Sequence, residues 1–77
     1  MNIERLATMV NDIANYFHAE PDHRVAVEGI SGHLKKFWEP RMRRQIIAYV
    51  NSDDSSGLNP LAREGVLRLA ELDAAKS

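Results

Sequence analysis

The chain has 77 residues, no cysteine and a formal net charge of −1, with 10 Lys and Arg against 11 Asp and Glu. This length predicts one domain over residues 1–77 with a thin core, because a domain near this size buries only about 60% of the surface that its unfolded chain exposes. The lack of cysteine excludes disulfides and thiolate zinc sites, and the small net charge excludes an overall attraction to nucleic acid or anionic membranes.

The N-terminal residues include polar and acidic side chains, Asn2 and Glu4, where a secretory signal would need an unbroken apolar stretch. No apolar run approaches the roughly 18 residues that a membrane span requires. We therefore expect a soluble protein that resides in the cytoplasm and makes no membrane contact.

The first predicted helix covers residues 2–20. Its apolar residues recur every three or four positions from Ile3 to Phe17, which places them along one side of a helix. Asn2 is a suitable N-cap, and Pro21 disfavours helical geometry in the residue before it, so the helix should end there.

The second predicted helix covers residues 22–38, with four apolar residues at helical spacing: Val27, Ile30, Leu34 and Phe37. Gly29 and Gly32 interrupt it, each at a cost of about 1 kcal/mol relative to Ala inside a helix. We interpret this pair as a helical irregularity or a packing contact between small residues.

The third predicted helix covers residues 40–50, because Pro40 fits the first turn of a helix, where its missing N–H needs no partner. Glu39 and Arg43 have a favourable spacing of four for an ion pair. The inward face should carry Met42, Ile46, Tyr49 and Val50, and the outward face Arg41, Arg44 and Gln45.

A polar stretch at residues 51–57 predicts a loop, and Asn59-Pro60 then begins a fourth helix over residues 60–74. The sequence therefore predicts an all-α fold, a small bundle of about four helices. Short connections favour antiparallel packing among the first three helices, whereas the longer loop lets the fourth helix either close the bundle or reach another surface.

No catalytic or metal-binding constellation is visible. The serines lack a nearby histidine in sequence, and nucleophilic catalysis needs a base close to the nucleophile. The three histidines, His18, His23 and His33, lack the spacing that puts two ligands on one helical face. We therefore predict no catalytic residues, no bound metal and no cofactor.

Residues 33–44, HLKKFWEPRMRR, hold five of the ten Lys and Arg residues and the only Trp, around one proline. Two interpretations stand side by side. In the first, the apolar residues belong to the core at a helix corner and the charged residues form a solvated face. In the second, Trp38 and the arginines form an interface with a partner, because Trp and Arg are enriched at interfaces. For Phe37 and Met42 the spacing favours the core. The candidate partner-binding residues are Lys35, Trp38, Arg41, Arg43 and Arg44.

Residues 33–44, preceded by 9–14 (MVNDIA) and followed by 57–61 (GLNPL), resemble the delta subunit of soluble NAD-dependent formate dehydrogenases that contain molybdenum or tungsten. The similarity covers nearly the whole chain. It implies an accessory subunit without cofactor or catalytic residues, in a cytoplasmic complex whose other subunits carry the metal cofactor, iron–sulfur clusters and flavin. That complex interconverts formate and carbon dioxide with NAD as electron partner.

The hypothesis that follows is a non-catalytic accessory subunit that binds the large (alpha) subunit of the complex through the candidate residues and supports assembly or stability. Two alternatives use the same segment. A self-associating homodimer would bury the apolar face around Trp38 against a second copy. A nucleic-acid-binding module would place the arginines on phosphates, but its basic patch is short, which makes it the weaker alternative.

Overall fold

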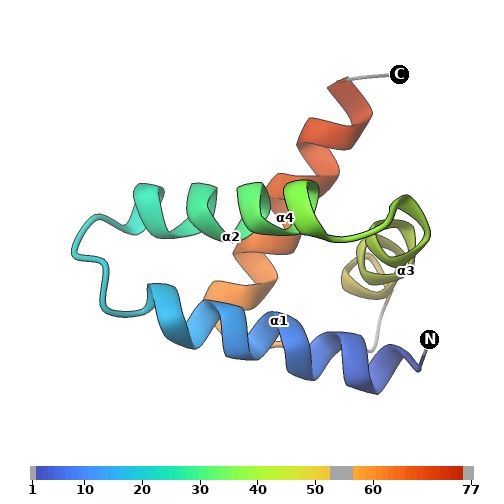
Figure 1. Cartoon of the computed structure of the whole chain (residues 1–77), viewed down its shortest axis with the longest axis horizontal. Coiled ribbons are helices and arrows are strands. Elements are labelled where there is room, and N and C mark those ends of the chain that lie inside the picture. Colours follow the sequence, from blue (N-terminus) through green and yellow to red (C-terminus); the bar gives the residue numbers. More distant parts are fainter. Residues whose placement is uncertain (1, 53–56, 76–77) are drawn as a thin grey trace.

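The computed structural model describes residues 2–52 and 57–75, and these residues form four α-helices and no strand (Figure 1). The helices are α1 (Ile3–Phe17), α2 (His23–Phe37), α3 (Pro40–Val50) and α4 (Pro60–Ala75). The predicted all-α class and the four helix positions are confirmed, with the largest difference at the end of α1. Within the predicted loop, residues 53–56 lie outside the described residues.

Each helix begins where a local capping signal stands in the sequence. The Asn2 side chain accepts a hydrogen bond from the Glu4 N–H at 2.7 Å, and the Asp22 side chain accepts one from the Arg24 N–H at 3.0 Å. Pro40 occupies the first turn of α3. These caps satisfy N–H groups that have no partner inside the helix.

The helix pair α1–α2 forms the centre of the fold, with the two helices side by side and antiparallel (Figure 1). The helix α4 crosses behind this pair and packs most extensively on α2, so it closes the bundle. The helix α3 runs crosswise at one end and packs on α1 and α4 more than on α2. The expected antiparallel packing of α2 and α3 is therefore wrong.

The core lies where α4 crosses α1 and α2. Its largest fully buried apolar side chains come from all four helices and are Leu6, Val10, Ile30, Leu34, Ile46, Val50, Val66 and Leu69. The single buried polar side chain among the described residues, Ser31, donates a hydrogen bond to the Glu28 carbonyl at 3.1 Å, which satisfies its hydroxyl.

Hydrogen bonds between residues far apart in the sequence connect the start of α4 to α1. The Asn11 side-chain amide donates to the Gly57 carbonyl at 2.7 Å, and its oxygen accepts from the Asn59 N–H at 2.9 Å. The Asn59 side chain in turn accepts from the Ala62 N–H at 2.7 Å and caps α4. Asn11 therefore fixes where α4 begins its path across the helix pair.

Two glycines allow helices to approach closely. A Cβ atom at Gly29 would overlap the Phe17 ring of α1, and one at Gly65 would lie 2.8 Å from the Ile30 Cβ of α2. A Cβ at Gly32 would meet nothing within 4 Å. The helix α2 is continuous, so the interpretation of the glycine pair as a helical irregularity is wrong. Gly29 does make a packing contact, but with the large Phe17 ring and not with another small residue.

Candidate docking surface

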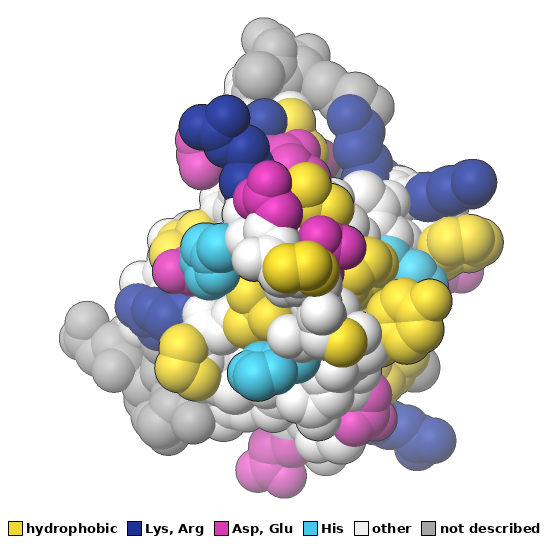
Figure 2. Space-filling model, turned by 90° about the vertical axis from the view of Figure 1, so that its left-hand side faces the viewer, with side chains coloured by type: hydrophobic (Ala, Val, Ile, Leu, Met, Phe, Trp, Pro, Cys, Tyr) yellow, Lys and Arg dark blue, Asp and Glu magenta, His cyan; other side chains and the backbone are white. Residues whose placement is uncertain are grey.

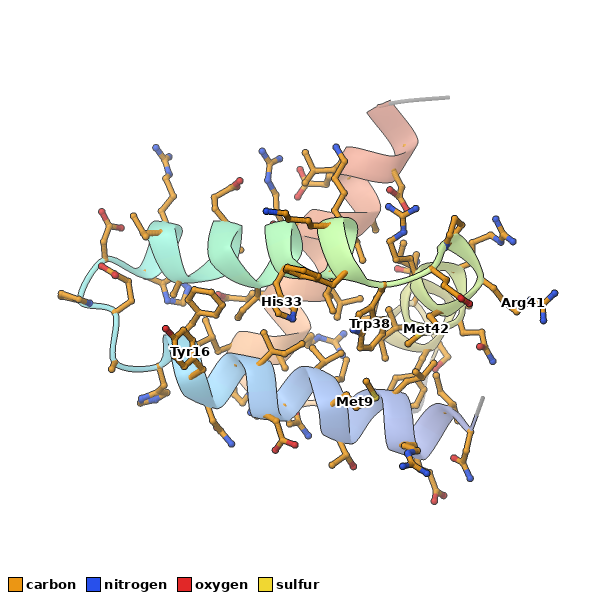
Figure 3. The ribbon with its side chains drawn as sticks, in the orientation of Figure 1. Met9, Tyr16, His33, Trp38, Arg41 and Met42 are labelled. Atoms are coloured by element: carbon orange, nitrogen blue, oxygen red, sulfur yellow. The ribbon has the colours of Figure 1, made fainter. Side chains whose placement is uncertain are left out.

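The predicted partner-binding segment forms the corner between α2 and α3. At this corner Trp38 leaves helical geometry, with φ −90° and ψ 141°, while its N–H still donates to the Leu34 carbonyl at 2.9 Å. The turn directs the indole inward, next to Met42 in Figure 3, and the residue is only 7% exposed. Trp38 is therefore part of the core in the isolated chain.

Arg43 is also partly buried. One of its terminal nitrogens, Nη1, lies 3.4 Å from the Lys35 carbonyl, and its buried Nε has no hydrogen-bond partner among the described residues. Its backbone N–H donates to the Glu39 carbonyl at 3.0 Å, but no ion pair between these two side chains occurs in the part described. Arg43 thus braces the corner from inside, and Lys35 is half-buried beside it.

Arg41 and Arg44 behave differently, because both are exposed on α3. Figure 3 shows Arg41 extending away from the bundle, on the side opposite to the indole of Trp38. The five predicted residues therefore do not share one face. We call Lys35, Lys36, Arg41, Arg43 and Arg44 the basic corner, of which Lys36, Arg41 and Arg44 are accessible.

The most exposed large apolar side chains among the described residues belong to two aromatic residues outside the predicted partner-binding set. Tyr16 is 79% exposed and Phe37 is 65% exposed. The expectation that Phe37 lies in the core is wrong. Helical spacing places Phe37 on the apolar stripe of α2, but the backbone turn that follows sends the neighbouring Trp38 into the core instead.

Tyr16 and Phe37 belong to an apolar surface on the side of α1–α2 that α4 does not cover. Figure 3 shows Met9, Tyr16 and His33 along this side. We call this surface the open face and define it by Met9, Ile13, Tyr16, Phe17, His33 and Phe37, all at least partly exposed. It contains a hollow of about 350 Å³ between Ile13, Tyr16 and Phe17 of α1 and His33 of α2.

Ring contacts order the open face. The rings of Tyr16 and Phe17 meet edge to face at 5.2 Å, and those of His33 and Phe37 lie 4.8 Å apart. The Lys36 ammonium lies 5.5 Å from the Phe37 ring centre, within the range of a cation–π contact. Phe37 therefore joins the open face to the basic corner.

A second hollow, of about 520 Å³, lies where the α1–α2 connection meets the start of α4. Figure 2 looks onto this end and shows histidine and acidic side chains around apolar ones. There His23 Nε2 contacts the Glu64 carboxylate. The described ranges, 2–52 and 57–75, contain no group of three His, Asp or Glu side chains able to hold a metal ion.

None of the helices in the described part is long and apolar enough to cross a membrane. The open face places exposed aromatic side chains next to the accessible cations of the basic corner. Such a combination is suited to contact with another polypeptide, because aromatic anchors and arginines contribute most to interface energies.

Comparison with known proteins identifies a family. Residues 5–66 match the family model described as NADH-dependent formate dehydrogenase delta subunit FdsD. The matched range includes most of α1, all of α2 and α3, and the first part of α4. A search of curated proteins and a search of solved structures each found no match.

Proposed function

Because this chain belongs to the family of NADH-dependent formate dehydrogenase delta subunits, we propose that it is a non-catalytic accessory subunit of a cytoplasmic formate dehydrogenase complex. In this role it binds the large, cofactor-bearing subunit and supports assembly or stability of the complex. The family match over residues 5–66 is the observation that carries the proposal.

Two features of the molecule support a docking role. A single core of this size rarely supplies more than roughly 3–5 kcal/mol, so a partner that binds the folded form would stabilise it appreciably. In addition, Tyr16 and Phe37 leave a large aromatic area exposed to water. Because burial of a large apolar side chain contributes about 1.5–3 kcal/mol, a partner that covers these rings would gain free energy of binding. Both features favour a chain that completes its packing on another subunit.

The candidate residues divide between two tasks in this proposal. Arg41 and Arg44 supply accessible cations for carboxylates of the large subunit, whereas Lys35 is half-buried and takes part through its carbonyl, 3.4 Å from Arg43 Nη1. Trp38 and Arg43 hold the corner in shape from inside and act on binding through the position of α3.

Omission of this chain tests the proposal. The formate dehydrogenase subunits are expressed with and without it, and the complexes are separated by size. We expect a smaller fraction of assembled, metal-loaded complex without the chain, and little change in formate turnover per assembled complex. Equal assembly with and without the chain would contradict the assembly role, and a loss of turnover in fully assembled complex would contradict a non-catalytic one.

A further inference from the structure

The helix pair α1–α2 is covered on one side and open on the other. Behind the pair, α4 places Ala62, Val66 and Leu69 in full burial against it. In front, no described helix lies over the pair, and Tyr16 and Phe37 remain largely exposed. This open side therefore presents uncovered apolar side chains next to the hollow of about 350 Å³.

The hollow in the open face is large enough to receive an apolar side chain. It has a volume of about 350 Å³ and is lined by Ile13, Tyr16, Phe17 and His33, three of them with rings. Aromatic side chains give a large contact area at low cost in conformational entropy. An amphipathic helix laid on such a surface inserts side chains at spacings of three and four.

Charge is distributed unevenly along the open face. Residues 33–44, at its Phe37 end, carry five Lys and Arg and one acidic residue, Glu39, and the start of α1 adds Glu4 and Arg5 at the same end. Residues 18–24, at the opposite end, carry Glu20 and Asp22 against Arg24. No carboxylate within residues 2–52 and 57–75 forms an ion pair with Arg41 or Arg44. An occupant with carboxylates at this end would meet complementary charge.

We propose that the open face binds an amphipathic helix of the partner subunit, which places apolar side chains against Tyr16 and Phe37 and its acidic end at the basic corner. This inference rests on the proposed function and specifies the chemistry of the docking segment. It differs from the expectation drawn from the sequence, because the apolar anchor is the Tyr16–Phe37 face and Trp38 serves as its support.

Binding of the purified large subunit to the full chain tests the apolar part. In the double variant Tyr16→Ser with Phe37→Ser, we expect the dissociation constant to rise about tenfold or more, as for loss of interface anchors. The matched control is Leu67→Ser on α4, which removes a 38% exposed apolar side chain away from the open face and should change binding less than about twofold. Circular dichroism verifies that both variants keep their helices.

The results separate this inference from the proposed function. If the wild-type chain itself does not bind the large subunit, the proposed function fails. If the wild-type chain binds and the double variant binds equally well, only the open-face inference fails. The more conservative pair Tyr16→Phe with Phe37→Leu should retain most of the affinity, because it keeps the apolar bulk.

Charge reversal tests the acidic end of the occupant. Arg41→Glu with Arg44→Glu should raise the dissociation constant about threefold to tenfold and make binding less sensitive to salt. Arg24→Glu, at the opposite end of α2, is the matched control and should have a smaller effect. Equal effects of the two changes would overturn the assignment of the acidic end.

A photo-crosslinking side chain in place of Phe37 identifies the occupant. We expect crosslinks to one segment of the partner subunit, at residues three and four apart, with Asp or Glu at one end of that segment. The same label in place of Leu67 should give far fewer crosslinks. Crosslinks from position 37 to a second copy of this chain, or to an extended segment, would overturn the inference.

Discussion

The two sides of the α1–α2 pair differ in how completely their apolar side chains are buried. On the covered side, Gly65 lets α4 approach α2 closely, and Ile30, Val66 and Leu69 are completely buried there. On the open side, the apolar side chains include large aromatic ones that are exposed to solvent, with Tyr16 79% and Phe37 65% exposed. On the covered side small residues and aliphatic side chains stabilise the fold, whereas on the open side aromatic area is left at the surface.

This difference separates stability from recognition within one small domain. A thin core cannot lose much packing, so its contacts must be close and complete. On the open side Tyr16 and Phe37 are mostly in water, so we expect that these two residues can change without unfolding the chain. Substitutions on the covered side should therefore alter the free energy of unfolding, and those on the open side should alter binding.

The neighbours Trp38 and Phe37 give the strongest test of this contrast. Trp38→Ala should lower the free energy of unfolding by about 3–5 kcal/mol, as for other large-to-small core substitutions, which is enough to unfold much of a marginal domain. Phe37→Ala should change it by only about 0.5 kcal/mol, because the ring is mostly in water. Urea unfolding followed by circular dichroism at 222 nm measures both.

Similar losses in the two variants would show that Phe37 contributes to the core, and the division between the two sides would fail. The pair also bears on binding studies. Loss of docking in Trp38→Ala carries no information about contact unless the variant is shown to be folded.

The covered side should also resist addition of a single methyl group. In Gly65→Ala the new Cβ would lie 2.8 Å from the buried Ile30 Cβ, so α4 and α2 must move apart. Such overpacking costs about 1–3 kcal/mol and outweighs the gain of up to about 1 kcal/mol in helix propensity. Gly29→Ala should cost less, because its Cβ would meet the ring end of the partly exposed Phe17. Thermal unfolding ranks the two variants.

Gly32 provides the opposite case on the same helix. Its Cβ position is empty, its φ is not positive and the residue is exposed. Gly32→Ala should therefore raise the free energy of unfolding by about 0.5–1 kcal/mol through helix propensity alone. The melting temperature of this variant, compared with that of Gly65→Ala, measures the effect. A decrease would mean that something packs on this surface of α2.

Local signals account for what could be predicted from the sequence. Asn2 and Asp22 cap their helices, and Pro40 and Pro60 begin theirs, because capping depends on residues within one turn. The all-α class follows from the same signals together with the helical spacing. The family could also be predicted from residues 33–44 and the segments around them, because the order of residues in this segment resembles one family specifically.

The candidate site was predicted only in part, because its geometry depends on one turn of the backbone. Helical spacing treats Phe37 as continuing the stripe of Leu34, and it cannot show that the extended backbone at Trp38 exchanges the two aromatic residues between core and surface. Likewise, Gly29 and Gly32 look alike in sequence, and only the neighbouring helix distinguishes them. Tyr16 had a usable signal, since it lies off the apolar stripe of α1.

The smallest expected effect concerns charge on the covered side. There Arg68 Nε of α4 lies 2.6 Å from Glu28 Oε1 of α2, in the part of the interface where the two helices remain in water. Their side chains are 37% and 48% exposed, so solvent screens the attraction and a coupling of about 0.2–1 kcal/mol is expected. A double-mutant cycle with Arg68→Ala and Glu28→Ala measures it, at low and high salt. A coupling well above this range that survives high salt would mean that charge, and not close apolar packing, holds α4 on the helix pair.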